Sequence, residues 1–531
     1  MVKRFLDEES LATGLPLRAL LAIALGIHVA VALLAVNPWH PDEHFQILEF
    51  AWAHAGLAPL EDLPWEWDAR IRSTLQPTIA LVLLQALRAI GLTSPFLWAL
   101  VLRLGTLVLS FAVLLRVFAH VSPSLSRPAR QTLWLSGLFL WFTPLFLGRF
   151  SSENLGGLAL AAALTLVDGE GAGERRDGAG PRRDAVAGAL LGLSLVFRFQ
   201  MALAAAAVLA WLIAQGRPGW ARAARVALAA AAVVAAGTLV DAWFYQGWAF
   251  TPWAYFRTNV LEGVASSFGT SPWYAYLLWP PLWMVPPLGI AVALLAAAGV
   301  ASRPRSPWSW VAVAFVAGHS VVPHKELRFL FPLLYLLPVL VARGVEAARR
   351  RPWAPGWRAA AVWSLGVQNA IFLALLATPA IHRGGEFDAH YLRFLWTTAE
   401  RHPGETVYVL QDEGSPHLIY GLEANVYRHP RIRGVHHRPG DPLPSDVPPD
   451  TPPDRLLVLT RGAVSPVVAG AEATELAYAA EPGYRVMARL IGIEDAGWVR
   501  WLEGVDRWST SDRARRVHRV RVAGAPGGGA P

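Results

Sequence analysis

Asp42 and Glu43 are two adjacent carboxylates between His40 and His44. A carboxylate beside a reacting hydroxyl can accept its proton as a new bond forms, which is general-base catalysis, and the neighbouring acid can then position a substrate. Pro41 restricts its own φ and the conformation of His40, so it stiffens the segment. The alternative interpretation is that both acids simply face water, as most carboxylates do.

Basic residues gather much later in the chain, directly after Pro323. Since proline suits the first turn of a helix, we expect a helix to begin there, with His324 and Arg328 one turn apart and Lys325 beside them. Cations at a helix N-terminus form an anion site, and a departing lipid phosphate needs its negative charge neutralised. The alternative is that these side chains only extend toward a membrane surface.

Other polar side chains interrupt the apolar segments or end them. Arg149 and Glu153 are four positions apart across one break, and Arg198 breaks a later segment. Charged groups at membrane depth are costly and usually face an interior cavity, although they can also form structural ion pairs. We therefore take six side chains as candidate substrate-binding residues: His40, Arg149, Glu153, Arg198, Asp241 and Tyr245.

Metal and cofactor chemistry finds little support in the sequence. His40 and His44 are four positions apart, so a metal bridge is conceivable, but no further ligand set has fitting spacing. There is no glycine-rich phosphate-binding motif. The chain has no cysteine, which excludes disulfides and thiolate catalysis. We expect an activity that needs no metal or other cofactor.

The elements that must position these residues are membrane-spanning helices. The chain has 531 residues, of which 54% are hydrophobic, and its mean hydropathy is +0.36. Apolar segments of spanning length recur along it, which predicts about ten to twelve transmembrane helices. Leu15–Val36 lacks a signal-peptide cleavage site, so we expect a first helix that is retained. Gln46–Ala55 is typical of an amphipathic helix lying at the interface.

The net charge of +8 comes almost wholly from arginines in short loops, so it does not indicate a nucleic-acid partner. Positive loops face the cytoplasm, which places the acidic and basic motifs on the external face. If both apolar segments between Leu75 and Phe118 span fully, the later sides invert. The external placement of the later motifs requires that one of these two segments is half-inserted or re-entrant, or that the Ala185–Ala214 region crosses the membrane a different number of times. The aromatic stretch Phe268–Tyr274 favours an interfacial anchor over a sugar platform.

The sequence divides into three expected parts: a transmembrane domain at 1–381, an external α/β domain at 382–523 and a disordered tail at 524–531. Strand-like segments of the second part alternate with turn-rich ones, and they are Thr406–Leu410, Arg455–Leu459 and Tyr484–Ile491. The arginine-rich, lysine-poor composition indicates a bacterial genome. The expected location is therefore the bacterial inner membrane, or the endoplasmic reticulum membrane if the source is eukaryotic.

At the acidic motif around Asp42 and the basic motif around Lys325, the chain resembles the polytopic mannosyltransferases of glycosyltransferase family twenty-two. These enzymes use polyprenyl-phosphate-mannose in GPI-anchor and N-glycan assembly. Two blocks match closely, His40–Gln46 and His324–Pro332, and their order and distance also fit. Weaker matches extend the resemblance over most of Leu15–Thr378, at Gly148–Asn154, Asp241–Tyr245, Pro252–Asn259 and Phe268–Tyr276.

The resemblance implies an all-α polytopic membrane protein of GT-C type, with its active site on the external or lumenal face. It implies inverting transfer from a lipid-phosphate sugar, commonly without a required metal, with Asp42 as the base and Glu43 as its partner. The chain departs from the family pattern at Ser151–Asn154 and at Ser271, positions that bear on the acceptor and the sugar.

We therefore expect an integral-membrane mannosyltransferase. Its expected partners are a polyprenyl-phosphate-linked sugar donor, a glycan or glycolipid acceptor and the lipid bilayer. Two alternatives stay open: a GT-C transferase that uses another lipid-linked sugar, and a transporter or flippase of lipid-linked sugars. A transporter should place ionisable groups along a midplane path and show inverted repeats, and the sequence has no internal repeat.

Overall fold

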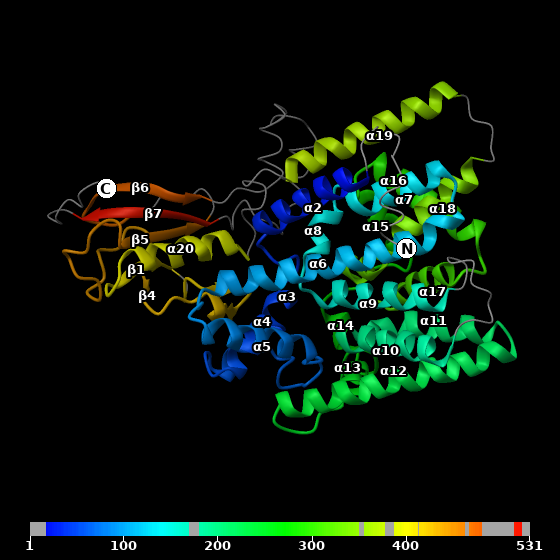
Figure 1. The fold of residues 1–531 in the computed structure, drawn as a ribbon. Coiled ribbons are helices and arrows are strands. Elements are labelled where there is room, and N and C mark those ends of the chain that lie inside the picture. The colour runs from blue at the N-terminus through cyan, green and yellow to red at the C-terminus, as the bar shows by residue number, and fades with distance from the viewer. Residues whose placement is uncertain are drawn as a thin grey trace. The chain divides into compact units, whose positions relative to one another are not determined.

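The computed structural model describes residues 17–168, 180–349, 355–376, 387–412, 414–461, 467–479 and 515–522. The described chain is mostly helical and carries a small β-sheet near its C-terminal end (Figure 1). This confirms the expected fold class, a helical membrane protein with a small C-terminal α/β part. The strand predicted at Tyr484–Ile491 and the tail at 524–531 lie outside the described residues.

The chain forms two compact units. The first comprises Met1–Leu33, Trp65–Val82 and Leu100–Ala374, and the second comprises Leu34–Pro64, Leu83–Ala99 and Leu375–Pro531. The acidic motif around Asp42 therefore belongs to the second unit, and the basic motif around Lys325 belongs to the first. The domain boundaries expected from the sequence stay a prediction.

Helices make up the regular structure of the described first unit, and four of them, α2, α5, α6 and α19, also contribute residues to the second. In chain order they are α2 (Leu17–Leu34), α5 (Leu75–Ala89), α6 (Pro95–Val121), η2 (Ser122–Ser124), α7 (Arg127–Phe139), α8 (Thr143–Leu147), α9 (Ser152–Val167), α10 (Pro181–Phe197), η4 (Phe199–Met201), α11 (Ala202–Ile213), α12 (Arg217–Phe244), α13 (Thr251–Phe256), η5 (Arg257–Leu261), α14 (Val264–Ser267), α15 (Ala275–Trp283), α16 (Leu288–Ser302), α17 (Pro307–Val321), η6 (Leu327–Tyr335), α18 (Leu337–Ala348) and α19 (Pro355–Leu376).

Three helices of the described chain are long and apolar enough to cross a bilayer by themselves: α2, α12 and the continuous helix Pro95–Ser124. The pair η6 and α18 also qualifies, with a bend of 68° between its halves. Five shorter apolar helices accompany them, at Leu75–Ala89, Ser152–Val167, Phe199–Ile213, Leu288–Ser302 and Val362–Leu376. Several long apolar helices confirm a multi-pass membrane protein, while the expected number of spans stays a prediction.

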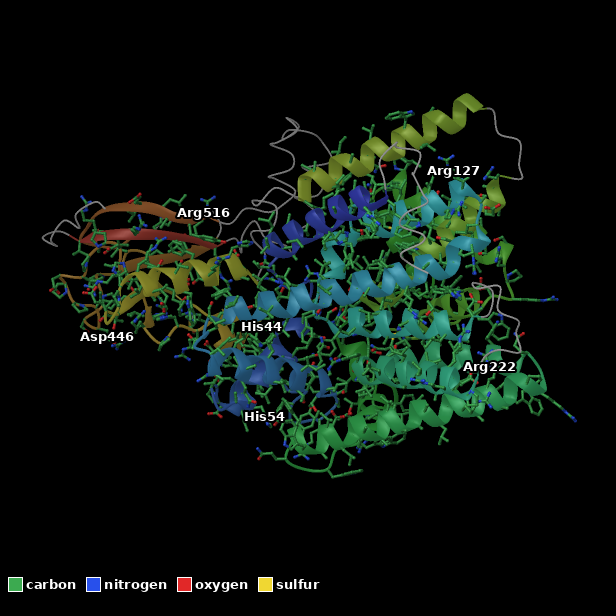
Figure 2. The ribbon with its side chains drawn as sticks, in the orientation of Figure 1. His44, His54, Arg127, Arg222, Asp446 and Arg516 are labelled. Atoms are coloured by element: carbon green, nitrogen blue, oxygen red, sulfur yellow. The ribbon has the colours of Figure 1, made fainter. Side chains whose placement is uncertain are left out.

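The interior of the first unit is apolar, and side chains such as Phe118 and Trp308 are fully buried in it. Helices α9, α10 and α12 lie side by side (Figure 1). Near the start of α12, Arg222 and Arg225 bind the buried carboxylate of Asp184 on α10, at 3.0 and 2.7 Å. Figure 2 labels Arg222. These contacts fix the packing of the helices that carry the predicted site residues.

The second unit contains a five-stranded sheet of order β4-β1-β5-β7-β6, in which β1 pairs in parallel with β4 and β5 and the other pairs are antiparallel. Helix α20 lies beside these strands (Figure 1). The elements are α3 (Asp42–Phe45), α4 (Leu48–His54), η1 (Leu60–Asp62), α20 (Ala389–Arg401), β1 (Val407–Gln411), β2 (Leu418–Ile419), β3 (Leu422–Glu423), η8 (Asn425–Tyr427), β4 (Ile432–His436), β5 (Leu456–Arg461), β6 (Ala471–Ala479) and β7 (Arg515–Val522). The helix predicted within Gln46–Ala55 and two of the predicted strands are confirmed as α4, β1 and β5.

Candidate active site

The acidic motif forms a single helical turn, α3, which begins at Asp42. The backbone N–H of Asp42 donates to Nδ1 of His40 at 3.3 Å, and the Asp42 carboxylate lies 3.2 Å from the same nitrogen. The side chain of Asp42 is 22% exposed and that of His40 is 33% exposed, and Glu43 is also partly exposed. Asp42 is therefore accessible to a substrate and lies next to an imidazole, as a general base would.

The basic motif does not start a helix. The helix predicted to begin at Pro323 begins instead at Leu327, as the 3₁₀ helix η6. Glu326 is extended, with φ −134° and ψ 144°, and its N–H donates to the hydroxyl of Tyr276 at 3.2 Å. The carbonyl of Pro323 accepts from the N–H of Ser271 at 2.9 Å. Because a neighbouring segment uses these backbone groups, the prediction of a helix at Pro323 is wrong.

Glu326 joins the basic side chains to one another. Its Oε1 accepts from Nε2 of His324 at 3.0 Å and from Nη2 of Arg328 at 3.3 Å, and its Oε2 accepts from Nε of Arg328. Nδ1 of His324 donates to the carbonyl of Gly269 at 2.8 Å. Both ring nitrogens face acceptors, and the hydrogen bond to Glu326 raises the pKa of His324 above its usual value. This environment favours the charged imidazolium.

Lys325 is held by backbone carbonyls. It is 6% exposed, and its Nζ donates to the carbonyl of Val322 at 2.5 Å and to that of Ser271 at 3.0 Å. An ammonium group has three N–H donors, so these carbonyls use two of them. A carbonyl has no net charge, so it fixes the ammonium in place without neutralising it.

Glu153 connects the basic motif to two further elements. It lies in the first turn of α9 and is 3% exposed. Its Oε1 accepts from Nη1 of Arg198 at 2.8 Å and from Nη1 of Arg328 at 3.4 Å. Arg198 lies at the break between α10 and η4, where its Nη1 also donates to Oγ of Ser152 at 3.0 Å. We call the following group the cation–carboxylate cluster: Glu153, Arg198, His324, Lys325, Glu326 and Arg328.

The cluster carries an excess of positive charge. Arg198, Lys325 and Arg328 are cations at neutral pH, against two carboxylates, and a protonated His324 adds one more positive charge. The guanidiniums of Arg198 and Arg328 both lie near the ring of Phe329, at 5.2 and 5.5 Å from its centroid. An aromatic ring attracts cations through its quadrupole, so Phe329 helps to keep two like charges close together. Such a cluster suits an anionic ligand.

A glycine on α9 allows one of the arginine-bearing segments to approach Glu153. A Cβ atom at Gly157 would lie 2.7 Å from Cα of Pro332 in η6. A Cβ atom at Gly156 would lie 3.6 Å from Cβ of Arg198, which is an ordinary van der Waals distance, so the approach of Arg198 does not require that glycine. The missing side chain at Gly157 therefore lets η6 pack against α9 closely enough for Arg328 to reach Glu153.

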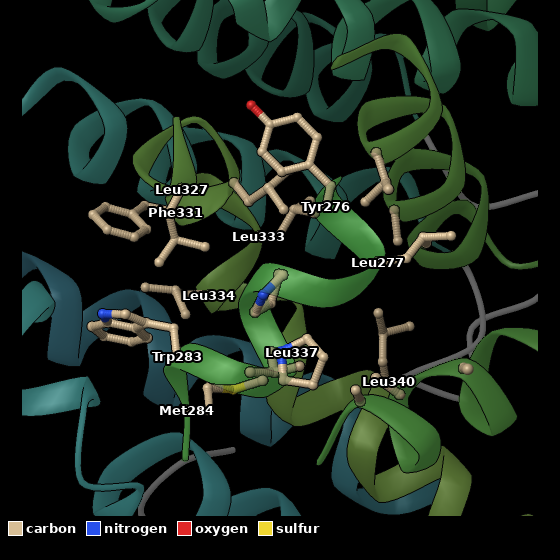
Figure 3. A pocket seen from close by; sticks show the side chains of 18 of the residues that line it. Tyr276, Leu277, Trp283, Met284, Leu327, Phe331, Leu333, Leu334, Leu337 and Leu340 are labelled. Atoms are coloured by element: carbon tan, nitrogen blue, oxygen red, sulfur yellow. The ribbon is translucent and has the colours of Figure 1, made fainter. Parts of the chain in front are cut away.

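An apolar cavity of approximately 940 Å³ adjoins the cluster. Figure 3 shows side chains that line this cavity. Helices α15, α16 and α17 line it together with η6 and α18. Tyr276 lines the cavity and donates through its hydroxyl to the carbonyl of Glu326 at 3.1 Å. Leu327, the next residue along the chain, lines it as well, and Trp283 and Phe331 add aromatic surface. The cavity suits a hydrocarbon chain whose polar end lies at the cluster.

Asp241 fastens a different part of the first unit. Its Oδ1 accepts from the N–H and the hydroxyl of Thr74 at 2.6 and 2.8 Å, and its Oδ2 accepts from the hydroxyl of Thr251 at 2.5 Å. The hydroxyl of Tyr245 donates to the carbonyl of Arg72 at 2.9 Å. These bonds tie the end of α12 to the loop before α5 and to the start of α13. They favour a structural role, so substrate binding by Asp241 and Tyr245 stays a prediction.

Arg149 lies at the break between α8 and α9. Its Nε donates to the carbonyl of Leu145 at 2.8 Å, and its own carbonyl accepts from the side-chain amide of Asn154 at 2.8 Å. The carboxylate of Glu153, four positions later, is met by arginines from two other elements. Participation of Arg149 in ligand binding stays a prediction.

Glu326 and Tyr276 are cluster contacts that the sequence reasoning missed. Glu326 stands between three basic residues in the sequence, and a lone acid in that position was the available signal. No group of three or more His, Asp or Glu side chains in the part of the chain that the structure describes is arranged to hold a metal ion. Metal independence stays a prediction.

Comparison with known proteins identifies relatives of the chain. Residues 19–416 match the Alg9-like mannosyltransferase family. The chain is 28% identical over 382 residues to GPI mannosyltransferase 3 of Yarrowia lipolytica, and the match covers 69% of each protein. It is 32% identical over 160 residues to the Drosophila melanogaster protein named Dol-P-Man:Man(7)GlcNAc(2)-PP-Dol alpha-1,6-mannosyltransferase, a match that covers 29% of this chain and 22% of the relative.

Among solved structures, ArnT from Cupriavidus metallidurans bound to undecaprenyl phosphate is similar in fold, with a TM-score of 0.50 and 12% sequence identity. The superposition covers 97% of this chain and 99% of that one, which confirms the expected GT-C fold. The family match extends over well more than half of the sequence. The chain therefore belongs to the Alg9-like mannosyltransferase family, a family of glycosyltransferases, and is a multi-pass membrane protein.

Proposed function

We propose that this chain transfers mannose from polyprenyl-phosphate-mannose to a hydroxyl of a glycan or glycolipid, with inversion, on the external or lumenal face of its membrane. The observation that carries the proposal is the positive cluster directly beside a large apolar cavity, with Tyr276 touching both. A lipid-linked sugar phosphate has the same two parts, an anionic group and a long hydrocarbon chain. The bacterial inner membrane is the proposed location.

The donor phosphate is bound by Arg328, Lys325 and His324. In the structure these cations already bond to carboxylates or carbonyls, so a phosphate shares or replaces those partners. A phosphate oxygen accepts charge-assisted hydrogen bonds from the same cations as a carboxylate does, so it can take the place of these partners. It also keeps the charge of the leaving phosphate neutralised as the glycosidic bond breaks.

The hydrocarbon chain of the donor occupies the apolar cavity. Two names among the relatives agree with this class of donor: the Drosophila protein is named for Dol-P-Man, and the ArnT structure holds undecaprenyl phosphate. Both are polyprenyl phosphates or their mannosides. They support a lipid-linked donor for this chain, and the lining of the cavity supports it independently.

Chemistry at the sugar needs a base. Asp42, with Glu43 as its partner, accepts the proton of the acceptor hydroxyl while the hydroxyl oxygen attacks the anomeric carbon. The bond from that carbon to the phosphate oxygen breaks, and its electron pair leaves with the phosphate. The remaining candidates contact the sugar or the acceptor in this proposal: His40, Arg149, Glu153, Arg198, Asp241 and Tyr245. No metal takes part, so a chelator should leave the rate unchanged.

The test is transfer by the purified full-length protein in detergent, with radiolabelled polyprenyl-phosphate-mannose and a panel of acceptors. We expect release of polyprenyl phosphate together with a new mannoside. Asp42→Asn should lower the rate by about 10²–10⁴-fold, the usual contribution of a general base. Asp68→Asn, at an exposed acid of the first unit, is the matched control and should behave as the wild type.

Three outcomes contradict the proposal. Full activity of Asp42→Asn removes Asp42 from the mechanism. Transfer of a different lipid-linked sugar, with none of mannose, makes the chain a GT-C transferase of another specificity. Movement of the donor across the vesicle membrane, without formation of any new glycoside, makes the chain a transporter.

A further inference from the structure

A buried histidine–carboxylate pair lies directly behind the acidic motif. His44 and Glu49 are each 2% exposed, and Nε2 of His44 lies 2.8 Å from Oε1 of Glu49. A carboxylate can only accept, so Nε2 carries the proton and donates it to Glu49. Figure 2 labels His44 within the second unit. A pair this deeply buried needs other residues to cover it. Those residues follow the transmembrane part of the chain, from Phe387 to Tyr427.

The same carboxylate oxygen holds a backbone group of η8. The N–H of Val426 donates to Oε1 of Glu49 at 3.0 Å. The neighbouring ring of Tyr427 stacks on His44, with centroids 5.2 Å apart and planes 14° apart. The ring of Phe387 packs edge-on against that of His44, with centroids 4.7 Å apart and planes 66° apart. His44 and Glu49 are thus enclosed by residues from 387 to 427.

Further contacts join the same two stretches of chain. The N–H of Ala389 donates to the side-chain oxygen of Asn37 at 2.8 Å, before the acidic motif. The side-chain amide of Asn425 donates to the carboxylate of Asp62 at 2.9 Å, after it. Each of these pairs is at least 352 positions apart in the sequence. The acidic motif is therefore attached on both sides to the segment Phe387–Tyr427, which we call the clamp segment.

The geometry of α3 explains why this attachment matters. The helix has only four residues, and so short a helix has no stability of its own in water. Successive residues are about 100° apart around a helix axis, so Asp42 lies about 200° from His44. Burying His44 against Tyr427 therefore turns Asp42 away from the core, where it is 22% exposed. The orientation of the base depends on how His44 is held.

We propose that the clamp segment positions the catalytic acids, with His44, Glu49 and Tyr427 as positioning residues. The inference rests on the proposed function, because it takes Asp42 to be the base. It assigns a role in the reaction to residues that follow the transmembrane part of the chain. It also predicts that loss of the clamp slows the chemical step and leaves binding of the donor intact.

The experiment compares Tyr427→Leu and Glu49→Gln with the wild type, in the full-length protein. Tyr427→Phe keeps the stacked ring and should retain wild-type activity. His54→Gln on α4 is the matched control and should also behave as the wild type. We expect kcat to fall about 10²-fold in the first two variants, since a misplaced reacting group costs about that much. The KM for polyprenyl-phosphate-mannose should stay within about twofold, because the interactions that bind the donor are not removed.

Hydrogen exchange of the peptide that covers residues 40–47 supplies a readout that needs no activity. The N–H groups of His44 and Phe45 both bond to the carbonyl of Pro41 at 2.9 Å, so they report the state of α3. They should exchange faster in Tyr427→Leu and Glu49→Gln, while peptides of the first unit keep wild-type rates. Equal exchange in all variants overturns the proposal, and so does wild-type kcat in both of them.

The two proposals fail in different ways. If the wild type transfers no mannose, the proposed function fails, and the exchange data still decide whether the clamp segment orders α3. If Asp42→Asn is inactive while Tyr427→Leu and Glu49→Gln are fully active, the proposed function survives and the clamp fails. A general loss of thermal stability, with faster exchange in every peptide and kcat and KM changed together, assigns the clamp segment a merely structural role and also overturns the inference.

Discussion

The cation–carboxylate cluster of the first unit and the acidic motif of the second hold their charges in opposite ways. Glu153 is 3% exposed and bonds to two guanidiniums, so its charge is already compensated inside the protein. Asp42 is 22% exposed and lies next to an imidazole. A site that binds an anion needs cations held in fixed positions, whereas a general base needs to be accessible to the substrate group whose proton it accepts. The two environments match those two requirements.

The contrast also concerns what holds each region in place. Glu153 and Arg328 are held by each other, so a change at either one alters the binding site itself. Asp42 is held indirectly, through His44 and the residues that enclose it. Substitutions should therefore change donor binding and stability together in the first region, and the rate alone in the second. Three predictions test the first half of this comparison.

Removing the buried carboxylate should have the largest effect. Glu153→Gln leaves Arg198 and Arg328 buried without one of their anions, and breaking a buried ion pair costs about 3–5 kcal/mol. We expect a lower midpoint of thermal unfolding in detergent and a higher KM for the donor. Glu262→Gln is the matched control, because Glu262 is 43% exposed in its pair with Arg257 and should contribute at most about 1 kcal/mol. Equal shifts in both variants would show that burial does not distinguish the cluster.

Gly157→Ala should have an intermediate effect. The added methyl group meets the backbone of Pro332 at 2.7 Å, and overpacking of this kind costs about 1–3 kcal/mol. Because η6 must move away from α9, Arg328 loses its approach to Glu153, and the KM for the donor should rise with the loss of stability. Gly105→Ala, in α6, is the control, since a methyl group there meets no atom within 4 Å. A variant as stable and as active as this control would contradict the packing argument.

The pH dependence of donor binding should show the smallest effect. The hydrogen bond to Glu326 raises the pKa of His324 above its usual 6.5. The charged imidazolium, and the stability and anion binding that it contributes, are fully present below pH 6.5 and are lost as the pH rises through the raised pKa. The KM for the donor should increase across that range. Glu326→Gln should move the increase to lower pH, and His324→Gln should remove it; a wild-type profile in His324→Gln rules the imidazole out.

Local sequence patterns predicted the motifs and several elements of the fold. The acidic pair after the first apolar segment, the helix that follows it and the strands β1 and β5 each depend on a short stretch of residues with a clear period or composition. Arg198 and Glu153 were recognisable as charged residues that break apolar segments. Their pairing was not, because it depends on how α9, α10 and η6 pack, and the glycine that permits the packing has no chemical signature of its own.

The error at Pro323 has a similar origin. Its sequence fits a helix start, yet the carbonyl of Pro323 and the N–H of Glu326 bond to Ser271 and Tyr276. No local rule reveals a competing partner some fifty positions away, and the cations meet through Glu326 where helical spacing was expected to bring them together. Residues 387–427 likewise gave no local sign that they enclose His44, since the contact joins distant parts of the chain.

The attachment of α3 to the clamp segment has a consequence for biosynthesis. A ribosome makes the acidic motif early and reaches Phe387 only after the helices from α2 to α19 have been synthesised. Until then α3 has the contact with Glu49 and lacks those with Phe387 and Tyr427, so under the proposed function the newly made chain should be inactive. A product truncated before Phe387 should insert into the membrane and bind the lipid donor without transferring its sugar, and so compete with the intact enzyme for donor.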